Sequence, residues 1–313
     1  MTLLVADVGG TNTRLALVDG AGPLGKTARF ANDGFATFEA LLAAYAEGRA
    51  LPDLAGCCIA IAGPVTSDSA RLTNRDWHFD RAEIAACLPG LTAGSVRLIN
   101  DLAALGHALP ALAPAQLRDI RDGQATGAGN GQAVVMGLGT GVNICLTRAT
   151  GAGHVVIEAE LGHASLPLSV SDPLRAAIGA QVAAFPTVEE LFAGRGLSRL
   201  HGVLSGETRR AGQDILAEYD RGIPGPTAKT VDLIAGLLGH MARELVYMYQ
   251  PFGGIHFAGG VARGILGSAA RATFLAHFEA PGRFDDHIAR VPVRLIVDDA
   301  AALTGAAQVV APS

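Results

Sequence analysis

Two stretches of this chain share one pattern, in which an apolar run, a short turn of Gly with Thr and Asn, and a second apolar run follow one another. The first covers residues 3–18 and the second residues 134–146. Apolar runs joined by a glycine turn are typical of β-hairpins. Glycine lets the backbone approach a ligand closely, and successive amide groups in such a turn form a concave surface for an anion. We therefore expect two related halves that hold one polyphosphate, as in a nucleotide-dependent phosphotransferase built by duplication.

The rest of the pattern alternates short apolar runs with segments of helical periodicity, which predicts an α/β layer with parallel strands. Residues 161–172 are predicted to form a loop. Residues 110–132 are rich in Ala, Pro and Gly without a clear period, and we expect them to cross between two domains. The predicted strands are 27–30, 57–62, 96–99, 255–258 and 293–297, and the predicted helices are 35–50, 102–109, 187–192, 215–219, 231–249 and 300–310.

Composition narrows the class of protein. Half of the 313 residues are hydrophobic and the formal net charge is −5, which favours a globular protein and argues against nucleic acid as a partner. Asp7 interrupts the apolar start and no basic segment precedes it, so a signal peptide is not expected. No run approaches the ~20 apolar residues of a membrane span. The four cysteines lack C-x-x-C pairing, which favours reduced thiols in a cytoplasmic protein over disulfides or zinc.

Residues 20–27 match the phosphate-binding P-loop pattern G-x-x-x-x-G-K-[ST] letter for letter. A true P-loop requires a helix that begins at the Lys and Thr, because the first amides of that helix hold the phosphates. Here Asn32, Asp33 and Gly34 form a strong turn signal within about one helical turn of Thr27. We therefore predict a polar turn between two strands and no P-loop.

Polar side chains at the ends of the predicted strands are the first candidates for chemistry. Asp7 precedes the first turn, where a carboxylate either closes the turn or holds the hydrated Mg²⁺ that bridges nucleotide phosphates. Thr11 and Asn12 can donate hydrogen bonds to phosphate oxygens. Asn100 and Asp101 follow the strand at 96–99, either as ordinary helix caps or as a ligand site at the end of a strand. Asp101 could there accept a proton from an attacking sugar hydroxyl.

A second group of candidates follows the second hairpin. Glu160 and His163 stand beside an apolar strand, in either an exposed turn or a sugar site. Thr187 and Glu190 fit a helix capping box, which leaves Glu189 available for a ligand. Carboxylates and amides that each contact two hydroxyls are how a site recognises a sugar. The glycine pair at 259–260 would let adenine or ribose lie against the backbone, although many α/β turns have the same sequence without binding a ligand.

In their order along nearly the whole chain, these segments resemble bacterial glucokinases of the ATP-dependent hexokinase type, within the superfamily of actin, Hsp70 and sugar kinases. The resemblance implies an α/β protein with the two-domain ribonuclease-H-like (actin-like ATPase) fold and a cleft between a small α/β and a larger α+β domain. The small domain would cover 1–110, completed by a C-terminal helix at 298–313, and the large domain 111–297. The segments that carry the likeness are V-A-D-V-G-G-T-N at 5–12, A-I-A-G-P-V at 60–65, L-T-N at 72–74, L-I-N-D-L at 98–102, E-L-G-H at 160–163, the glutamate at 189 and F-A-G-G-V at 257–261.

The resemblance also implies a role for each candidate residue in a glucokinase that transfers the γ-phosphoryl group of ATP to the 6-hydroxyl of glucose, at the entry of glycolysis. Asp101 would be the catalytic residue and Asp7 the ligand of Mg²⁺. The family habit is a homodimer in the cytoplasm. The substrate-binding residues would be Asn100, Asp101, Glu160, His163 and Glu189. The nucleotide-binding residues would be Asp7, Gly9, Gly10, Thr11, Asn12, Gly139, Thr140, Gly259 and Gly260.

The chain departs from the family pattern in two segments. The second turn reads G-T-G-V-N at 139–143 where the family usually reads G-T-G-L-G, and residues 193–196 read A-G-R-G where S-G-P-G is more usual. No cysteine follows Cys145, so the structural zinc of the related repressor–kinase branch is not expected. Three alternatives stay open: a kinase for another hexose or an amino sugar, a non-enzymatic sugar-sensing regulator on the same scaffold, and ADP or polyphosphate as the donor.

Overall fold

The computed structural model describes residues 1–20, 22–49, 51–124, 129–151, 153–207 and 210–310. The chain divides into two compact units, called unit 1 (Met1–Ala113 with Asp298–Ser313) and unit 2 (Pro114–Val297) below. Parts of four predicted segments lie outside the described residues: position 21 of the P-loop-like segment, position 50 of the first predicted helix, 125–128 of the crossing and 311–313 of the C-terminal helix. Within the described ranges, no helix is both long and apolar enough to cross a membrane.

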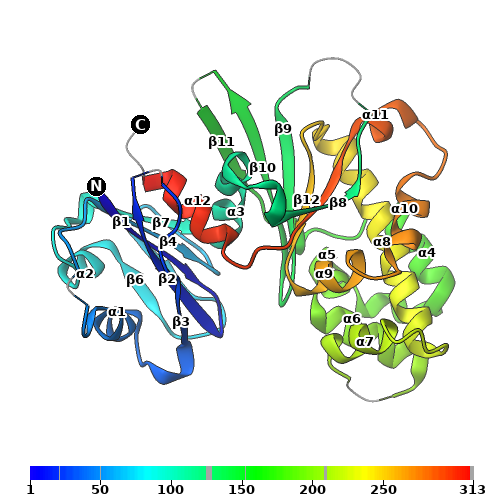
Figure 1. The fold of residues 1–313 in the computed structure, drawn as a ribbon. Helices are drawn as coiled ribbons and strands as arrows, with labels where there is room; N and C mark the ends of the chain where they lie inside the picture. The colour runs from blue at the N-terminus through cyan, green and yellow to red at the C-terminus, as the bar shows by residue number, and fades with distance from the viewer. Residues whose placement is uncertain (21, 50, 125–128, 152, 208–209, 311–313) are drawn as a thin grey trace. The chain divides into compact units, whose positions relative to one another are not determined.

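Unit 1 is built on a five-stranded sheet with the order β3-β2-β1-β4-β7, which Figure 1 draws in blue and cyan. β1 and β2 form the first predicted hairpin, and β3 pairs antiparallel with β2. β4 pairs in parallel with β1, and β7 in parallel with β4. The strands are β1 Thr2–Val8, β2 Asn12–Asp19, β3 Ala28–Ala31, β4 Gly56–Ile61 and β7 Val96–Asn100, with a separate pair of β5 Ser69–Arg71 and β6 His78–Asp80.

Both faces of the unit 1 sheet are covered, because side chains alternate between the faces along each strand. Leu4 and Ala6 of β1 belong to a core with α1, whereas Leu3 and Val5 belong to a core with α12. α12 also packs against α3. The helices of unit 1 are α1 Phe38–Ala46, α2 Arg81–Ala86, α3 Asp101–Ala108 and α12 Ala301–Val310, and its 3-10 segments are η1 Asn32–Gly34, η2 Ala93–Ser95 and η3 Leu109–Ala111.

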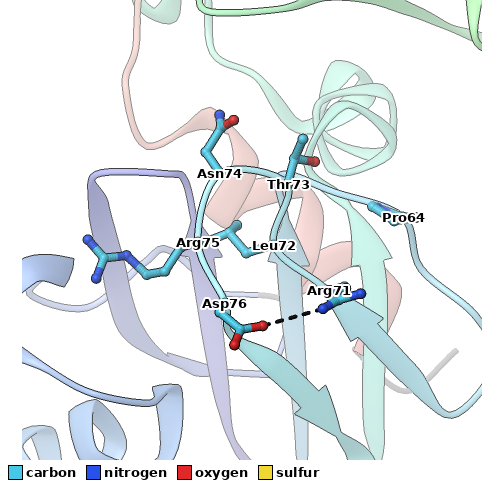
Figure 2. A pocket seen from close by; sticks show the side chains of 7 residues that line it. All are labelled: Pro64, Arg71, Leu72, Thr73, Asn74, Arg75 and Asp76. Carbon is cyan, nitrogen blue, oxygen red and sulfur yellow. Dashed lines mark hydrogen bonds and ion pairs between the residues drawn. The ribbon is translucent and has the colours of Figure 1, made fainter.

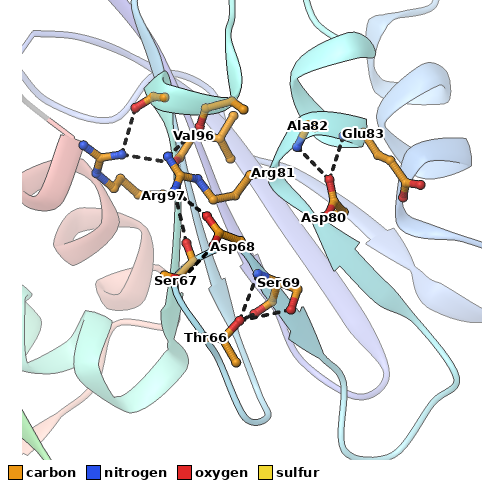
Figure 3. Close-up of polar contacts among 12 residues, drawn as sticks. Thr66, Ser67, Asp68, Ser69, Asp80, Arg81, Ala82, Glu83, Val96 and Arg97 are labelled. Atoms are coloured by element: carbon orange, nitrogen blue, oxygen red, sulfur yellow. Dashed lines mark hydrogen bonds and ion pairs between the residues drawn. The ribbon is translucent and has the colours of Figure 1, made fainter.

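Arg81 ties the loop before β5 to the start of α2 (Figure 3). Its Nη1 donates to the carbonyl of Ser67 and to Asp68 Oδ1, both at 3.1 Å, and its Nη2 donates to the carbonyl of Ala93 at 2.6 Å. Asp80 caps α2 by accepting hydrogen bonds from the first amides of the helix. These contacts fix the β5–β6 pair, whose connecting loop lines the pocket described below.

Unit 2 is built on a six-stranded sheet with the order β11-β10-β9-β12-β13-β8. The long helix α8 packs against α4, α6, α7 and α10, with its apolar face in the core. The strands are β8 Leu117–Arg121, β9 Gln132–Leu138, β10 Val142–Thr150, β11 Gly153–Glu158, β12 Gly254–Ala258 and β13 Val293–Ile296. The helices are α4 Leu168–Ile178, α5 Val188–Phe192, α6 Gly194–Ser205, α7 Gly212–Tyr219, α8 Pro226–Tyr249, α9 Gly260–Leu266, α10 Arg271–Phe278 and α11 Asp285–Arg290, with η4 Pro114–Gln116, η5 Leu161–His163 and η6 Gly179–Ala184.

The two sheets share one topology, as duplication predicts. In each, a hairpin (β1–β2 or β9–β10) gains a further antiparallel strand on one side (β3 or β11) and two parallel strands on the other (β4 and β7, or β12 and β13). In each, a helix follows the last parallel strand, α3 after β7 and α12 after β13. β8, which pairs antiparallel with β13, extends the unit 2 sheet beyond its last parallel strand and has no counterpart beside β7 among the described residues.

The structure confirms the rejection of the P-loop and corrects other predictions. No helix begins at Lys26 or Thr27, and β3 starts at Ala28. The first helix is shorter than predicted because Thr37 caps it and it ends at Ala46. The loop predicted at 161–172 is wrong in its second half. There α4 begins at Leu168, and Pro173 lies inside the helix. The predicted crossing contains β8, which sequence patterning missed because only one of its five residues is buried.

The contact between α3 and α12 yields a prediction for Gly305. A Cβ at this position would lie 1.7 Å from the carbonyl oxygen of Ala104. Gly305→Ala should therefore lower the free energy of unfolding by about 3 kcal/mol, although alanine normally favours a helix over glycine by about 1 kcal/mol. Urea unfolding measures this difference. The control is Gly34→Ala, since nothing lies within 4 Å of a Cβ there. A Gly305→Ala variant as stable as the parent would contradict the close helix contact.

Candidate active site

Parallel pairing in unit 1 brings three predicted segments to one edge of the sheet. Val8 pairs with Ile61, and Ile61 pairs with Asn100. The turn after β1, the Gly63 loop after β4 and the start of α3 after β7 therefore share the carboxyl edge, which is where α/β sheets bind ligands.

The first turn is held by Asn32, a fully buried side chain. Its Nδ2 donates to the carbonyl of Gly9 at 2.8 Å, and its Oδ1 accepts from Thr13 Oγ1 at 2.8 Å. Its backbone N–H donates to the carbonyl of Thr11 at 2.9 Å. Sequence reasoning missed this role, because the N-D-G segment is equally well explained as an ordinary turn. Thr11 is exposed, and Asn12 Oδ1 accepts from Arg29 Nε at 3.3 Å.

Asp7 is a buried carboxylate that forms an ion pair with Arg14. Arg14 Nη1 donates to Asp7 Oδ2 at 3.0 Å, and Arg14 Nη2 lies 3.8 Å from Asp299 Oδ2. Burial raises the pKa of Asp7 above its usual range, Arg14 opposes this rise, and Asp299 adds to it. Within the described residues, no group of three or more His, Cys, Asp or Glu side chains could hold a metal. Asp7 with Asp299 still fits Mg²⁺, which takes few protein carboxylates and completes its shell with phosphate oxygens and water.

Asn100 and Asp101 open α3, and Asn100 is its N-cap. Asn100 Oδ1 accepts from the amide of Leu102 at 2.9 Å, and its Nδ2 donates to the carbonyl of Gly63 at 3.3 Å. Asp101 is half-buried as the first residue of the helix, where its Oδ1 also accepts from Leu102 at 2.9 Å. The capping interpretation is thus confirmed for Asn100, and a role in ligand binding stays a prediction for both residues.

A pocket of about 570 Å³ lies beside the first turn. A Cβ on Gly10 would lie 3.6 Å from Asn74 Cβ, so the turn and the pocket are neighbours. Figure 2 shows Thr73 and Asn74 pointing to the top of the view, while Arg71 and Asp76 form an ion pair across the loop. The whole of the predicted segment 72–74 contributes to this pocket, and Pro64 contributes from the predicted segment 60–65. Its lining is Pro64, Arg71, Leu72, Thr73, Asn74, Arg75 and Asp76.

In unit 2 the structure brings Glu160, His163 and Glu189 together around the start of β10. Glu189 Oε2 accepts from the amide of Val142 at 2.8 Å. Glu160 Oε2 accepts from Asn143 Nδ2 at 2.9 Å and lies 3.9 Å from His163 Nε2. The packing is close, since a Cβ on Gly162 would lie 2.0 Å from the carbonyl oxygen of Val142. Both Glu160 and His163 are exposed and available to a ligand.

The capping box predicted at the start of α5 is only half present. Thr187 Oγ1 accepts from the amide of Glu190 at 3.3 Å, so Thr187 is the N-cap. The carboxylate of Glu190 instead pairs with Arg199 and Arg195, which lower its pKa below the usual range. Glu189 pairs with Arg195 as well, a contact that sequence reasoning also missed.

The Gly259–Gly260 pair lies beside the second turn. β12 runs parallel to β9, with Ala258 opposite Gly137. Gly259 has a φ of 95°, and a Cβ there would lie 2.3 Å from the carbonyl oxygen of Leu138. Only glycine fits this position. Space around the Cβ position of Gly260 is open.

Each unit thus gathers its own set of predicted residues. In unit 1 these are Asp7, Gly9, Gly10, Thr11, Asn12, Asn100 and Asp101. In unit 2 they are Gly139, Thr140, Glu160, His163, Glu189, Gly259 and Gly260.

Known proteins resemble this chain over nearly its whole length. A family model described as Glucokinase matches residues 4–313. A glucokinase from Cupriavidus pinatubonensis is 33% identical over 323 residues, covering 98% of this chain and 92% of that protein. The crystal structure of a glucokinase from an Antarctic psychrotroph has a TM-score of 0.82 and 26% identity, covering 99% of this chain and 98% of that one.

A more distant structure shares the same fold. It is a glucokinase of the ROK family from Streptomyces griseus in complex with glucose and AMPPNP, with a TM-score of 0.63 and 19% identity, covering 99% of each chain. Together with the mixed α/β architecture of both units, these likenesses confirm the expected actin-like ATPase fold class.

The bonds of Asn32 yield a prediction for the first turn. Asn32→Ala leaves the half-buried carbonyl of Gly9 without its side-chain donor, so the free energy of unfolding should fall by about 1–3 kcal/mol. Hydrogen exchange at the amides of residues 9–12 should also become faster, because the turn loses its anchor. Mass spectrometry of exchange measures this locally. The control is Asp33→Ala, which changes the exposed neighbour of Asn32. Equal exchange rates at residues 9–12 in the two variants would argue against the anchoring role of Asn32.

Proposed function

The chain belongs to the glucokinase family and is an ATP-dependent sugar kinase, and we propose that its substrate is glucose. The reaction transfers the γ-phosphoryl group of ATP to the 6-hydroxyl and yields glucose 6-phosphate and ADP. The glucose and AMPPNP bound in the Streptomyces griseus structure support this pair of substrates.

One observation carries the proposal. The carboxylate of Glu189 accepts a hydrogen bond from Val142, which directly follows the second glycine turn. Glu160 and His163 lie at the same end of β10. Groups suited to sugar hydroxyls therefore adjoin a turn suited to phosphate, which is the arrangement that phosphoryl transfer to a sugar requires.

Phosphate and nucleotide binding are assigned to the glycine turns. The amides and side chains of residues 9–12 and the turn at 139–140 donate to phosphate oxygens. Gly259 and Gly260 accept the adenosine part, since a glycine pair allows a flat group to approach the backbone. Asp7 holds Mg²⁺, which when bound neutralises charge on the transferring phosphoryl group.

Asp101 acts as the general base of the transfer. The oxygen of the sugar hydroxyl forms a bond to the γ-phosphorus, the bond from that phosphorus to the bridging oxygen of ADP breaks, and the hydroxyl proton moves to the Asp101 carboxylate. Asn100, the N-cap of α3, fixes the backbone from which Asp101 projects and binds the sugar beside it. With Asn100 and Asp101, the sugar ligands are Glu160, His163 and Glu189.

Glucose is chosen over other sugars by the geometry of these ligands, and a substrate panel tests this choice. With ATP as donor, kcat/KM for glucose should exceed the values for mannose, fructose and N-acetylglucosamine by about tenfold or more, because a misplaced hydroxyl leaves a polar group of the site unpaired. A coupled assay of ADP release measures all four, and ADP and polyphosphate replace ATP in a second series. If another sugar has the highest kcat/KM, glucose is not the preferred substrate. If no sugar of the panel is turned over, the proposed kinase reaction is wrong for these sugars.

Removal of the base yields a sharper prediction. Asp101→Asn should lower kcat by roughly 10²- to 10⁴-fold while leaving the dissociation constant of glucose nearly unchanged, because the amide keeps the shape but cannot take the proton. Calorimetry and steady-state kinetics give the two values. The matched control is Asp80→Asn, which also lies at a helix start and keeps a competent cap for α2. Near-normal turnover of Asp101→Asn would overturn the assignment.

A further inference from the structure

The second glycine turn is held by the first two residues of α6. The amide of Gly194 donates to the carbonyl of Gly139 at 2.9 Å. Arg195 Nη1 donates to the carbonyl of Thr140 at 3.2 Å. Two successive carbonyl groups of the turn are therefore fixed toward the start of α6.

This anchoring decides where the amides of the turn point. In a trans peptide the C=O of one residue and the N–H of the next point in opposite directions. The N–H groups of Thr140 and Gly141 are thus directed away from α6, and neither donates to an acceptor within the described part of the chain. Two adjacent N–H groups pointing the same way form the concave donor pair that an anion requires.

The Thr140–Gly141 peptide needs such an anchor because glycine does not hold it. Glycine adopts positive and negative φ with similar ease, so this peptide can rotate at little cost and turn its carbonyl toward a bound phosphate. A side chain at 141 could restrict the rotation, but a Cβ there would lie 2.8 Å from Glu189 Oε2. The Thr140 carbonyl is therefore held from outside the turn, by Arg195.

The guanidinium of Arg195 also contacts Glu189, which is proposed to bind the sugar. Arg195 Nη2 pairs with Glu189 Oε1, while Glu189 Oε2 accepts from Val142 at 2.8 Å. Arg195 Nε donates to Glu190 Oε1 at 3.2 Å. The planar fork of an arginine can serve three acceptors at once, which the point charge of a lysine cannot do with the same geometry. The hydrogen bond to Glu189 raises the pKa of Arg195, so the guanidinium stays charged.

We propose that Arg195 is a positioning residue that sets both the Gly141 amide for phosphate and the Glu189 carboxylate for the sugar. Affinity for nucleotide and affinity for sugar then depend on one side chain. This inference rests on the proposed function, since it assumes that the turn binds phosphate and that Glu189 binds sugar.

A neighbouring arginine provides a matched control. Arg199 lies one turn further along α6 and pairs with Glu190, as Arg195 does. Its other hydrogen bond goes to the carbonyl of Ala184, and within the described part of the chain it bonds neither Glu189 nor the second turn. The exposed fractions of the two side chains are similar, 47% for Arg195 and 40% for Arg199. Loss of a partly exposed ion pair alone should therefore have the same small effect at both positions.

The test compares Arg195→Ala with Arg199→Ala in steady-state kinetics. Arg195→Ala should raise KM for ATP and KM for glucose by about tenfold each, because each substrate loses one well-placed partner. Arg199→Ala should leave both values within about twofold of the parent. In a Glu189→Gln background, Arg195→Ala should still raise KM for ATP but should add little to KM for glucose, since the pair is already broken.

Arg195→Lys keeps the charge beside Glu189 and covers the case in which the alanine variant does not fold. It should hold KM for glucose within about threefold of the parent and leave KM for ATP raised, because one ammonium does not also reach the Thr140 carbonyl. Equal effects of Arg195→Ala and Arg199→Ala, or a rise in only one KM, would overturn the inference. An Arg195→Lys variant with an unchanged KM for ATP would also overturn the inference.

The failure of the proposed function remains distinguishable from the failure of this inference. Turnover of the parent protein with ATP and glucose tests the function before any variant is made. The shifts in melting temperature caused by ATP alone and by glucose alone report the two affinities without turnover. A parent that shows both shifts, with an Arg195→Ala variant that keeps both, would overturn the inference whether or not the parent turns over.

Discussion

Parallel strand pairing is the constraint on which the rest of the site depends. β1 pairs in parallel with β4, and β9 with β12, so the turn that follows each hairpin's first strand lies beside the carboxyl end of a neighbouring strand. In unit 1 this places the first turn at the edge where Asp101 begins α3. In unit 2 it places the second turn beside Gly259. A change in either pairing would separate the glycine turns from the groups proposed to act with them.

The two hairpins have the same antiparallel pairing but differ in the residue pair that lies opposite each other one position before the last pair at the turn. In the first, Asp7 lies opposite Arg14, and the pair keeps a carboxylate buried beside the turn. In the second, Gly137 lies opposite Asn143, so no carboxylate is present and the amide of Asn143 contacts Glu160 instead. Arg14 and Asn143 thus occupy equivalent positions in the second strand of each hairpin. Arg14 contacts the proposed metal ligand Asp7, and Asn143 contacts the proposed sugar ligand Glu160.

Sequence patterning predicted the elements whose signal is local. The buried strands β1, β4, β9 and β12 are apolar runs that end in turns, and all four were predicted within a few residues. The start of α4 was predicted as a loop up to residue 172, although Val170, Leu174 and Ile178 have helical spacing and form the buried face of this helix. The contacts of Asn32 with Gly9 and of Arg195 with Thr140 join segments that are distant in the sequence, so no local pattern could reveal them.

Capping and ligand binding are compatible uses of the same residues. Asn100 caps α3 through its Oδ1 and contacts the Gly63 loop through its Nδ2, which fixes the backbone from which Asp101 projects. Thr187 caps α5, and this fixes the helix start at which Glu189 reaches Val142. A cap orients the residue that follows it, because it holds the first turn of the helix. The capping roles of Asn100 and Thr187 are therefore compatible with the roles proposed for Asp101 and Glu189.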